Sequence, residues 1–284
     1  MKSGVKPKSC WTNPNPSFLI RNSHLMKRFL KLAFLSVLIL LLLAVGGFVI
    51  WAETPARPGP AALAALESDE FVYVFQRKDH IVFYPAICEA QIAEENATGQ
   101  PHVITALIFY PGGHVDYRAY APALRKIAEQ GVIVFLARVR LNLAFFDIEA
   151  GAPLLQTTEG IDVWAAGGHS LGGVAASIFA QNHPQVRGVV FWASYPADER
   201  FKAAGLPALS VYGTRDGLAA PDRIDQSRAL LPAATLFVPI EGGNHAQFGD
   251  YGFQSSDNPA SIPAETQWQQ AAQATVSFLQ SLTP

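Results

Sequence analysis

The stretch GGHSLGG, residues 167–173, places Ser170 between two pairs of glycines. The apolar run VWAA (163–166) precedes it, and residues 172–182 follow it with helical spacing. A serine among glycines at a strand-to-helix junction is typical of a nucleophile elbow, a turn so tight that its neighbours must lack side chains. The elbow raises the hydroxyl above the edge of a sheet and points the helix N-terminus at it. A glycine-rich phosphate-binding turn is the alternative, but the Lys of a P-loop and the GxGxxG spacing are absent.

The rest of the chain from residue 71 alternates short apolar runs with helix-like stretches, which indicates an α/β domain. Two runs split by charged residues predict an antiparallel hairpin, at 71–75 and 80–84. Six further apolar runs predict strands of a mostly parallel sheet, at 103–110, 132–137, 163–166, 189–193, 208–213 and 235–240. Helical spacing predicts flanking helices at 117–130, 172–182, 219–231 and 264–282.

A serine hydroxyl is a poor nucleophile until a base removes its proton, so a histidine and usually a carboxylate must lie beside Ser170. Asp216 directly follows the run ALSVYG, and His245 follows the next run, TLFVPI. Because parallel strands end at one edge of a sheet, we expect both residues in loops near Ser170, with His245 as the base and Asp216 as the acid. Asp250, shortly after His245, is the alternative acid, in which case Asp216 is only a turn residue.

Attack on a carbonyl creates an oxyanion, which two backbone N–H groups must stabilise. We expect Leu171, the residue after Ser170, to supply one of them. The loop PGGHV after residue 110 is expected to supply the other through Gly113 or His114, because glycine lets the backbone approach a ligand closely. A simple turn after Pro111 is the alternative interpretation of this loop.

Five stretches resemble the α/β-hydrolase superfamily, and more closely a bacterial branch of single-domain proteins related to the dienelactone hydrolases: YPGGHVDYRAYAP (110–122), LNLAFFD (141–147), GGHSLGG, VYGTRDGL (211–218) and GGNHAQFGDYG (242–252). The resemblance implies an α/β-hydrolase fold and a triad of Ser170, Asp216 and His245. Dienelactone hydrolases use a cysteine nucleophile where this chain has serine, so their lactone substrate is not carried over. The expected chemistry of Ser170, Asp216 and His245 needs no cofactor and no metal.

The N-terminal part differs in composition, because residues 1–58 hold eight Lys or Arg and one acidic residue. Leu32–Trp51 is a run of 20 residues without a charge. As a helix this run is about 30 Å long, the thickness of a bilayer core. Basic residues lie just before it, so the positive-inside rule places the N-terminus in the cytoplasm and the rest outside. A cleaved signal peptide that starts at Met26 and ends near Gly46 is the alternative.

We therefore expect four segments: a basic cytoplasmic segment (1–31), a transmembrane signal-anchor (32–51), a stiff Pro-rich linker (52–66) and an α/β-hydrolase domain (67–284). The protein is expected in the cell membrane as a single-pass protein with an extracytoplasmic domain, or secreted if the signal is cleaved. Residues 59–284 hold 13 basic and 22 acidic residues, a net charge of −9, which argues against a nucleic-acid partner. The two cysteines, Cys10 and Cys88, fall on opposite sides of the membrane, so no internal disulfide is expected.

The predicted activity is hydrolysis of a carboxylic ester, thioester or amide of a small-molecule acyl substrate through an acyl-enzyme. Only residues 194–207 separate two of the predicted strands, which is too short for a large helical cap. The site is therefore expected to be open. Two alternatives remain: a cofactor-free acyltransferase or perhydrolase that uses the same serine, and a membrane-tethered binding module without catalytic activity.

Overall fold

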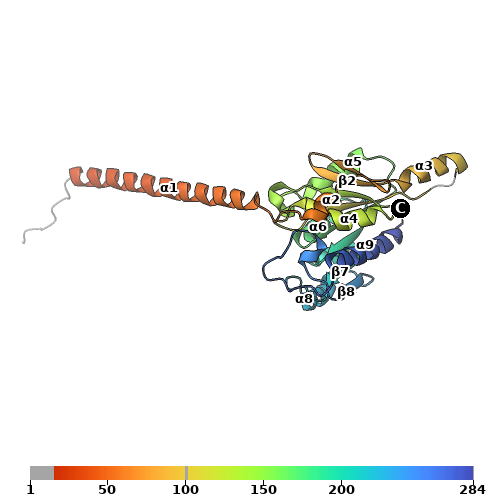
Figure 1. Ribbon diagram of the computed structural model, residues 1–284. Coiled ribbons are helices and arrows are strands. Elements are labelled where there is room, and N and C mark those ends of the chain that lie inside the picture. The colour runs from red at the N-terminus through yellow and green to blue at the C-terminus, as the bar shows by residue number, and fades with distance from the viewer. Residues whose placement is uncertain (1–15, 100–101, 284) are drawn as a thin grey trace, which may run out of the picture. The chain divides into compact units, whose positions relative to one another are not determined.

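The computed structural model describes residues 16–99 and 102–283 and divides into two compact units, residues 1–51 and 52–284. Helix α1 (Pro16–Ala52) makes up the described part of the first unit (Figure 1). Its most apolar window has a mean hydropathy of 2.9 and is not buried by any part of the protein. This exposed apolar helix contains the predicted run 32–51 and is consistent with a signal-anchor or a signal peptide. Cys10 and the basic residues before position 16 lie outside the described residues.

The second unit is built on one mixed sheet of eight strands in the order β1-β2-β4-β3-β5-β6-β7-β8. The strands are β1 (Val72–Gln76), β2 (His80–Pro85), β3 (Thr105–Tyr110), β4 (Ile133–Ala137), β5 (Val163–His169), β6 (Val186–Trp192), β7 (Ala208–Gly213) and β8 (Leu236–Ile240). β2 pairs antiparallel with both β1 and β4, and all other neighbours are parallel. The predicted hairpin and mostly parallel sheet are confirmed, and β5 lies near the centre.

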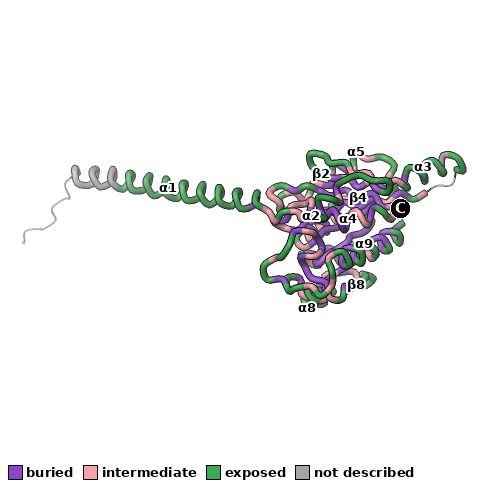
Figure 2. The backbone as a smooth tube through the Cα atoms, in the orientation of Figure 1, coloured by how far each residue is buried: buried purple, intermediate pink, exposed green. Residues whose placement is uncertain are grey.

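Helices cover both faces of this sheet, so that the strands are the most buried part of the domain (Figure 2). One apolar core, on one face, includes side chains of α4 (Ala121–Ala128), α8 (Pro221–Ser227) and α9 (Ala264–Gln280). A second core includes side chains of α5 (Ala152–Thr157), α6 (Leu171–Asn182) and α7 (Arg200–Ala204). The predicted arrangement of a parallel sheet between helical layers is therefore present.

Several helices differ from the prediction. Residues 117–120 form a separate 3-10 turn before α4, and α8 gives way to a 3-10 turn at Arg228–Leu230. Helix α3 (Ile87–Thr98) was not predicted, because most of its side chains are exposed and its sequence lacks a clear apolar stripe. Between β6 and β7 the chain forms only α7, a helix of 5 residues, as expected for a segment that is too short for a large cap.

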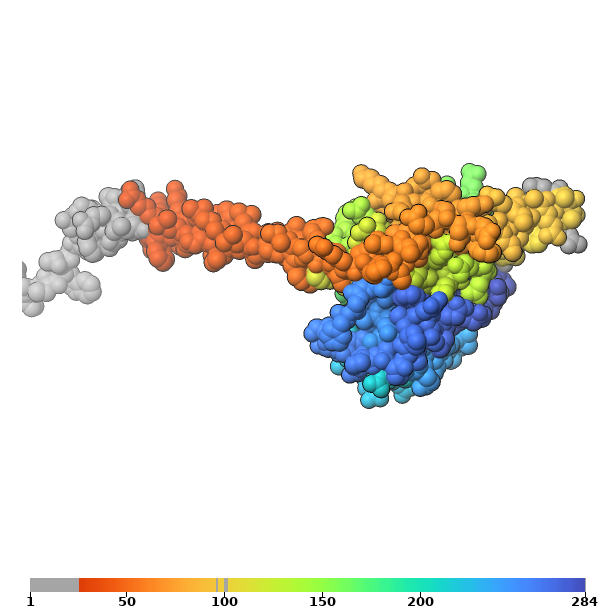
Figure 3. All heavy atoms as spheres, in the orientation of Figure 1, coloured from red at the N-terminus to blue at the C-terminus, as the bar shows by residue number. Residues whose placement is uncertain are grey.

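Residues 52–66, predicted as a stiff linker, are docked on the domain instead (orange in Figure 3). Ala56 pairs with the loop after β3: its N–H donates to the His114 carbonyl at 2.9 Å, and its carbonyl accepts from the Asp116 N–H at 2.9 Å. The first turn of helix α2 (Pro60–Ala64) is bonded to Asp250, whose carboxylate accepts the Ala62 N–H at 2.8 Å. The prolines stiffen this segment, and three of its side chains, Ala52, Ala62 and Leu66, are buried.

Candidate active site at the carboxyl edge of the sheet

Ser170 occupies the turn between β5 and α6 with φ +52° and ψ −122°. A non-glycine residue with positive φ costs about 1–3 kcal/mol of strain and needs surrounding contacts to hold it. The Ser170 N–H donates to the Trp192 carbonyl at 2.9 Å, and its own carbonyl accepts from the Ser194 hydroxyl at 2.6 Å. Bonds to β6 and to the loop after it therefore maintain the strained turn.

The glycines around Ser170 are required by close backbone contacts. A Cβ atom at Gly168 would overlap the backbone of Gly172. One at Gly172 would overlap the carbonyls of Tyr110 and Pro111 at the end of β3. The turn predicted from GGHSLGG is thus the one observed, and larger residues at these positions would push α6 away from the sheet.

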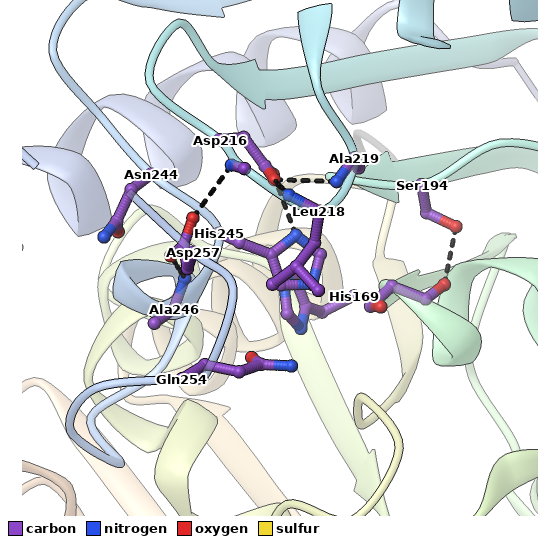
Figure 4. Close-up of polar contacts among 12 residues, drawn as sticks. His169, Ser194, Asp216, Leu218, Ala219, Asn244, His245, Ala246, Gln254 and Asp257 are labelled. Atoms are coloured by element: carbon purple, nitrogen blue, oxygen red, sulfur yellow. Dashed lines mark hydrogen bonds and ion pairs between the residues drawn. The ribbon is translucent and has the colours of Figure 1, made fainter. Parts of the chain in front are cut away.

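Asp216 and His245 lie in the loops after β7 and β8, and Figure 4 shows their side chains in contact. His245 Nδ1 is 2.8 Å from Asp216 Oδ2, and both side chains are almost completely buried. Asp216 Oδ1 accepts the N–H groups of Leu218 at 2.8 Å and Ala219 at 2.7 Å, which fixes the carboxylate. Because a carboxylate only accepts, His245 donates from Nδ1, and its Nε2 remains able to take up a proton.

Asp257 connects the loops that carry these two residues (Figure 4). Its Oδ1 accepts the N–H of Gly217 at 3.0 Å, next to Asp216, and its Oδ2 accepts the N–H of Ala246 at 2.9 Å, next to His245. Only 7% of Asp257 is exposed. Sequence reasoning missed this residue, because it lies in the irregular stretch QSSDNP, where no periodicity or motif points to it.

Asp250, the alternative acid, is directed elsewhere. Its carboxylate binds the start of α2, and its carbonyl accepts the Gly59 N–H at 2.6 Å. The carboxylate in contact with the His245 ring is therefore that of Asp216.

His169, which precedes Ser170, is buried against His245, with ring centroids 4.4 Å apart. Its Nδ1 lies 2.8 Å from the hydroxyl of Tyr120, which also accepts the Gly112 N–H at 3.0 Å. Burial holds the pKa of His169 well below its usual value, and the neighbouring His245 lowers it further. His169 is therefore neutral at physiological pH, and with Tyr120 it links the loop after β3 to His245.

The loop after β3 contains the two alternatives for the second oxyanion donor, Gly113 and His114. The His114 N–H donates to the Asn142 carbonyl at 2.8 Å, so His114 is not available as an oxyanion donor. The hydrogen bonds of the described residues include no acceptor for the N–H of Gly113 or of Leu171, which is the first residue of α6. Gly113 also lies against the Leu171 side chain, so that a Cβ atom at Gly113 would contact it.

Ser170 and His245 line one pocket of about 270 Å³. Its other lining residues are Leu171, Val174, Ala193, Ser194, Tyr195, Leu218 and Ala219. Within residues 16–99 and 102–283 the structure records no hydrogen bond between the Ser170 hydroxyl and His245. Two larger depressions, of about 720 and 620 Å³, share Arg138 and Asn142 and contain neither residue. The pocket that Ser170 and His245 line is therefore smaller than these two depressions.

Metal ligands are not grouped in the described part of the chain: no three or more His, Cys, Asp or Glu side chains there are arranged to hold an ion. Cys88 is buried and not in a disulfide.

Comparisons with known proteins agree with this architecture. The model of a family described as "Alpha/beta hydrolase family" matches residues 106–269. Among solved structures, Est1E from Butyrivibrio proteoclasticus superposes with a TM-score of 0.50 and 13% sequence identity, over 74% of this chain and 100% of that chain. At this identity the superposition shows a shared fold. A search of curated proteins gave no match.

Proposed function

Because this chain belongs to the alpha/beta hydrolase family, we propose that it is a serine hydrolase that cleaves a carboxylic ester, thioester or amide of a small molecule. The observation that carries the proposal is the 2.8 Å contact between His245 Nδ1 and Asp216 Oδ2, at a pocket that Ser170 also lines. The motifs that resemble the dienelactone hydrolases support a relation to that branch, with serine in place of cysteine.

In the proposed mechanism, Nε2 of His245 takes the proton from the Ser170 hydroxyl as the oxygen attacks the substrate carbonyl carbon. Asp216 keeps the imidazole in the required tautomer and stabilises the imidazolium. His245 then gives its proton to the leaving alcohol, thiol or amine, and an acyl-enzyme forms on Ser170. Water, activated by the same histidine, hydrolyses it. The bond from Ser170 to His245 forms as substrate binds, since catalytic hydrogen bonds often tighten only in the complex.

The proposed oxyanion hole consists of the N–H groups of Leu171 and Gly113. Support comes from the two donors themselves, which have no described acceptor and belong to adjacent segments. The hydrogen bond from the Gly112 N–H to Tyr120 holds the start of this loop. Each such donor contributes on the order of 10²–10³-fold to kcat in comparable enzymes.

We also propose that α1 is an uncleaved signal-anchor and that the hydrolase domain lies outside the cytoplasm. Support comes from the exposure and hydropathy of the helix and from the basic residues that precede it in the sequence. A cleaved signal peptide remains the alternative and leads to a secreted form.

The deciding experiment is labelling of the full-length protein with a fluorophosphonate probe, which reacts with an activated serine. We expect labelling of Ser170, its loss in Ser170→Ala, and retention in the matched variant Ser277→Ala, since Ser277 is exposed on α9 and belongs to none of the loops of the site. Ser170→Ala is also expected to lower hydrolysis of short 4-nitrophenyl esters by several orders of magnitude. A folded protein without labelling would favour the non-catalytic binding module.

An acyltransferase or perhydrolase would label in the same way as a hydrolase. These activities are distinguished by the acceptor, so the product of a 4-nitrophenyl ester is analysed with and without an added alcohol. Free acid as the main product in both cases supports hydrolysis, and transfer to the alcohol at millimolar concentration supports an acyltransferase.

A further inference from the structure

The pocket beside Ser170, called here the acyl pocket, indicates which acyl groups the site accepts. We infer that its substrates carry an uncharged, largely apolar acyl group of modest size. This inference rests on the proposed function, because it concerns the substrate of the same serine.

The walls of the acyl pocket come from three parts of the fold. Val174 projects from the first turns of α6, Ala193 follows β6, and Leu218 with Ala219 follows Asp216 in the loop after β7. None of the residues that line the pocket is Lys, Arg, Asp or Glu. An acyl chain in this pocket would therefore meet mostly methyl and methylene groups, whose burial favours apolar ligands.

A carboxylate on the acyl group would lose part of its hydration without gaining a cation. Burial of an ionised group that lacks a partner carries a large free-energy cost. The hydroxyl of Ser194 does not offset this cost, because it is already bonded to the Ser170 carbonyl. A terminal carboxylate is therefore strongly disfavoured by the walls alone.

The charged groups near His245 also disfavour an anionic acyl group. Asp216 and Asp257 are buried carboxylates that flank His245, and their described partners are backbone N–H groups and the His245 ring. Neither forms an ion pair with a Lys or Arg among the described residues. With these two carboxylates nearby and no Lys or Arg in the lining, the site offers an anionic acyl group no compensating charge. A cationic group is not repelled by the carboxylates but must still be desolvated by the apolar walls, so we expect its kcat/KM to lie between those of the uncharged and the anionic group.

The volume of the acyl pocket limits the size of the acyl group. The pocket has a volume of about 270 Å³, and a heavy atom of the size of water occupies about 30 Å³, so the pocket holds roughly nine heavy atoms. Each additional methylene that is buried contributes about 0.8 kcal/mol, or about fourfold in kcat/KM. We expect kcat/KM to increase from acetate to about hexanoate or octanoate and to level off once the chain extends beyond the pocket.

The test compares three 4-nitrophenyl esters with similar chain lengths: hexanoate, the mono-ester of adipate, and 4-(trimethylammonio)butanoate. The assay uses the full-length protein at a pH of about 7.5, at which the free carboxyl group of the adipate ester is ionised. We expect kcat/KM for hexanoate to exceed that for adipate by on the order of 100-fold. The trimethylammonio ester should fall between them. Equal kcat/KM values for hexanoate and adipate would overturn the inference and leave the hydrolase proposal intact.

A variant pair tests whether the walls are the cause. Leu218→Arg places a cation at the edge of the acyl pocket and should reduce the preference for hexanoate over adipate by at least about tenfold. Leu218→Gln, of similar size but uncharged, should leave that preference within about threefold of the parent protein. An unchanged preference in Leu218→Arg would contradict the role assigned to the pocket walls.

A second measurement needs no turnover. The rate of labelling of Ser170 is compared for an alkyl fluorophosphonate and for one with a terminal carboxylate on a chain of equal length. Faster labelling by the uncharged probe supports the inference, and equal rates contradict it. If neither probe labels Ser170 in folded protein, the proposed nucleophile itself is wrong, and that outcome is distinct from a failure of the acyl preference.

Discussion

Replacement of Asp257 by asparagine changes one oxygen into an NH₂ group at the link between the two loops of the site. The remaining oxygen can still accept the N–H of Gly217 at 3.0 Å. The new NH₂ group would face the N–H of Ala246, which now donates to Oδ2 at 2.9 Å. A buried N–H without an acceptor costs about 1–3 kcal/mol, so we expect Asp257→Asn to lower the free energy of unfolding by about 2 kcal/mol.

The same change should affect the position of His245, because Ala246 follows it directly. A displacement of about 1 Å at a reacting group lowers the rate on the order of 100-fold. We therefore expect kcat for 4-nitrophenyl butyrate to fall by about 10- to 100-fold, while KM changes by less than about threefold, because Asp257 does not line the acyl pocket.

The assay combines thermal unfolding of the full-length protein in detergent with steady-state kinetics. A loss of about 2 kcal/mol in a domain of this size lowers Tm by about 4–8 °C. Asp222→Asn, at an exposed position of α8, is the matched control and should change Tm by less than about 2 °C and leave kcat unchanged. A lower Tm with unchanged kcat would show that Asp257 is only structural, and an unchanged Tm would refute the hydrogen-bond argument.

Three further predictions concern the acid, a neighbouring histidine and the membrane topology. Asp216→Asn should lower kcat by up to about 10⁴-fold, because the imidazole of His245 then takes the wrong tautomer. Asp250→Asn should affect mainly stability. A greater loss of kcat in Asp250→Asn than in Asp216→Asn would overturn the assignment of the acid. The pKa of His169 is lowered by burial, so the folded protein loses stability as pH falls below about 6.5, by up to about 1.4 kcal/mol per pH unit. His169→Gln should flatten this part of a plot of Tm against pH, and an equal slope in both proteins would contradict the argument. A reporter enzyme fused after residue 284 should be active only outside the cytoplasm, and a soluble product shortened near Gly46 would instead indicate a cleaved signal peptide.

The strands and the positions of the main candidate residues relative to them were predictable from local features of the sequence. Each of the eight strands coincides with an apolar run, since a sheet covered on both faces requires apolar side chains in nearly every position. The positions of Asp216 and His245 followed from the ends of two such runs, because parallel strands present their carboxyl ends at one edge. The elbow at Ser170 followed from its glycines, which the backbone contacts require.

Other parts of the site depend on contacts between distant segments and leave no local pattern. The exclusion of His114 as a donor depends on the carbonyl of Asn142, in a different loop. The bond between Tyr120 and His169 joins residues 49 positions apart. Asp257 acts only on backbone N–H groups, so its role does not depend on any neighbouring side-chain motif. Such contacts become visible only once the fold places the loops side by side.

The docking of residues 52–66 has a consequence for how the protein matures. Ala56 is bonded on both sides to the loop that carries Gly113, and Asp250, in the His245 loop, holds the start of α2. Cleavage of a signal near Gly46 would leave all of these bonds intact, so the anchored and secreted forms would have the same active site. A protease that trims the chain beyond Pro60 would instead remove the support of two loops of the candidate site at once. The boundary of the folded unit therefore lies at the end of the apolar helix and not at the first strand of the sheet.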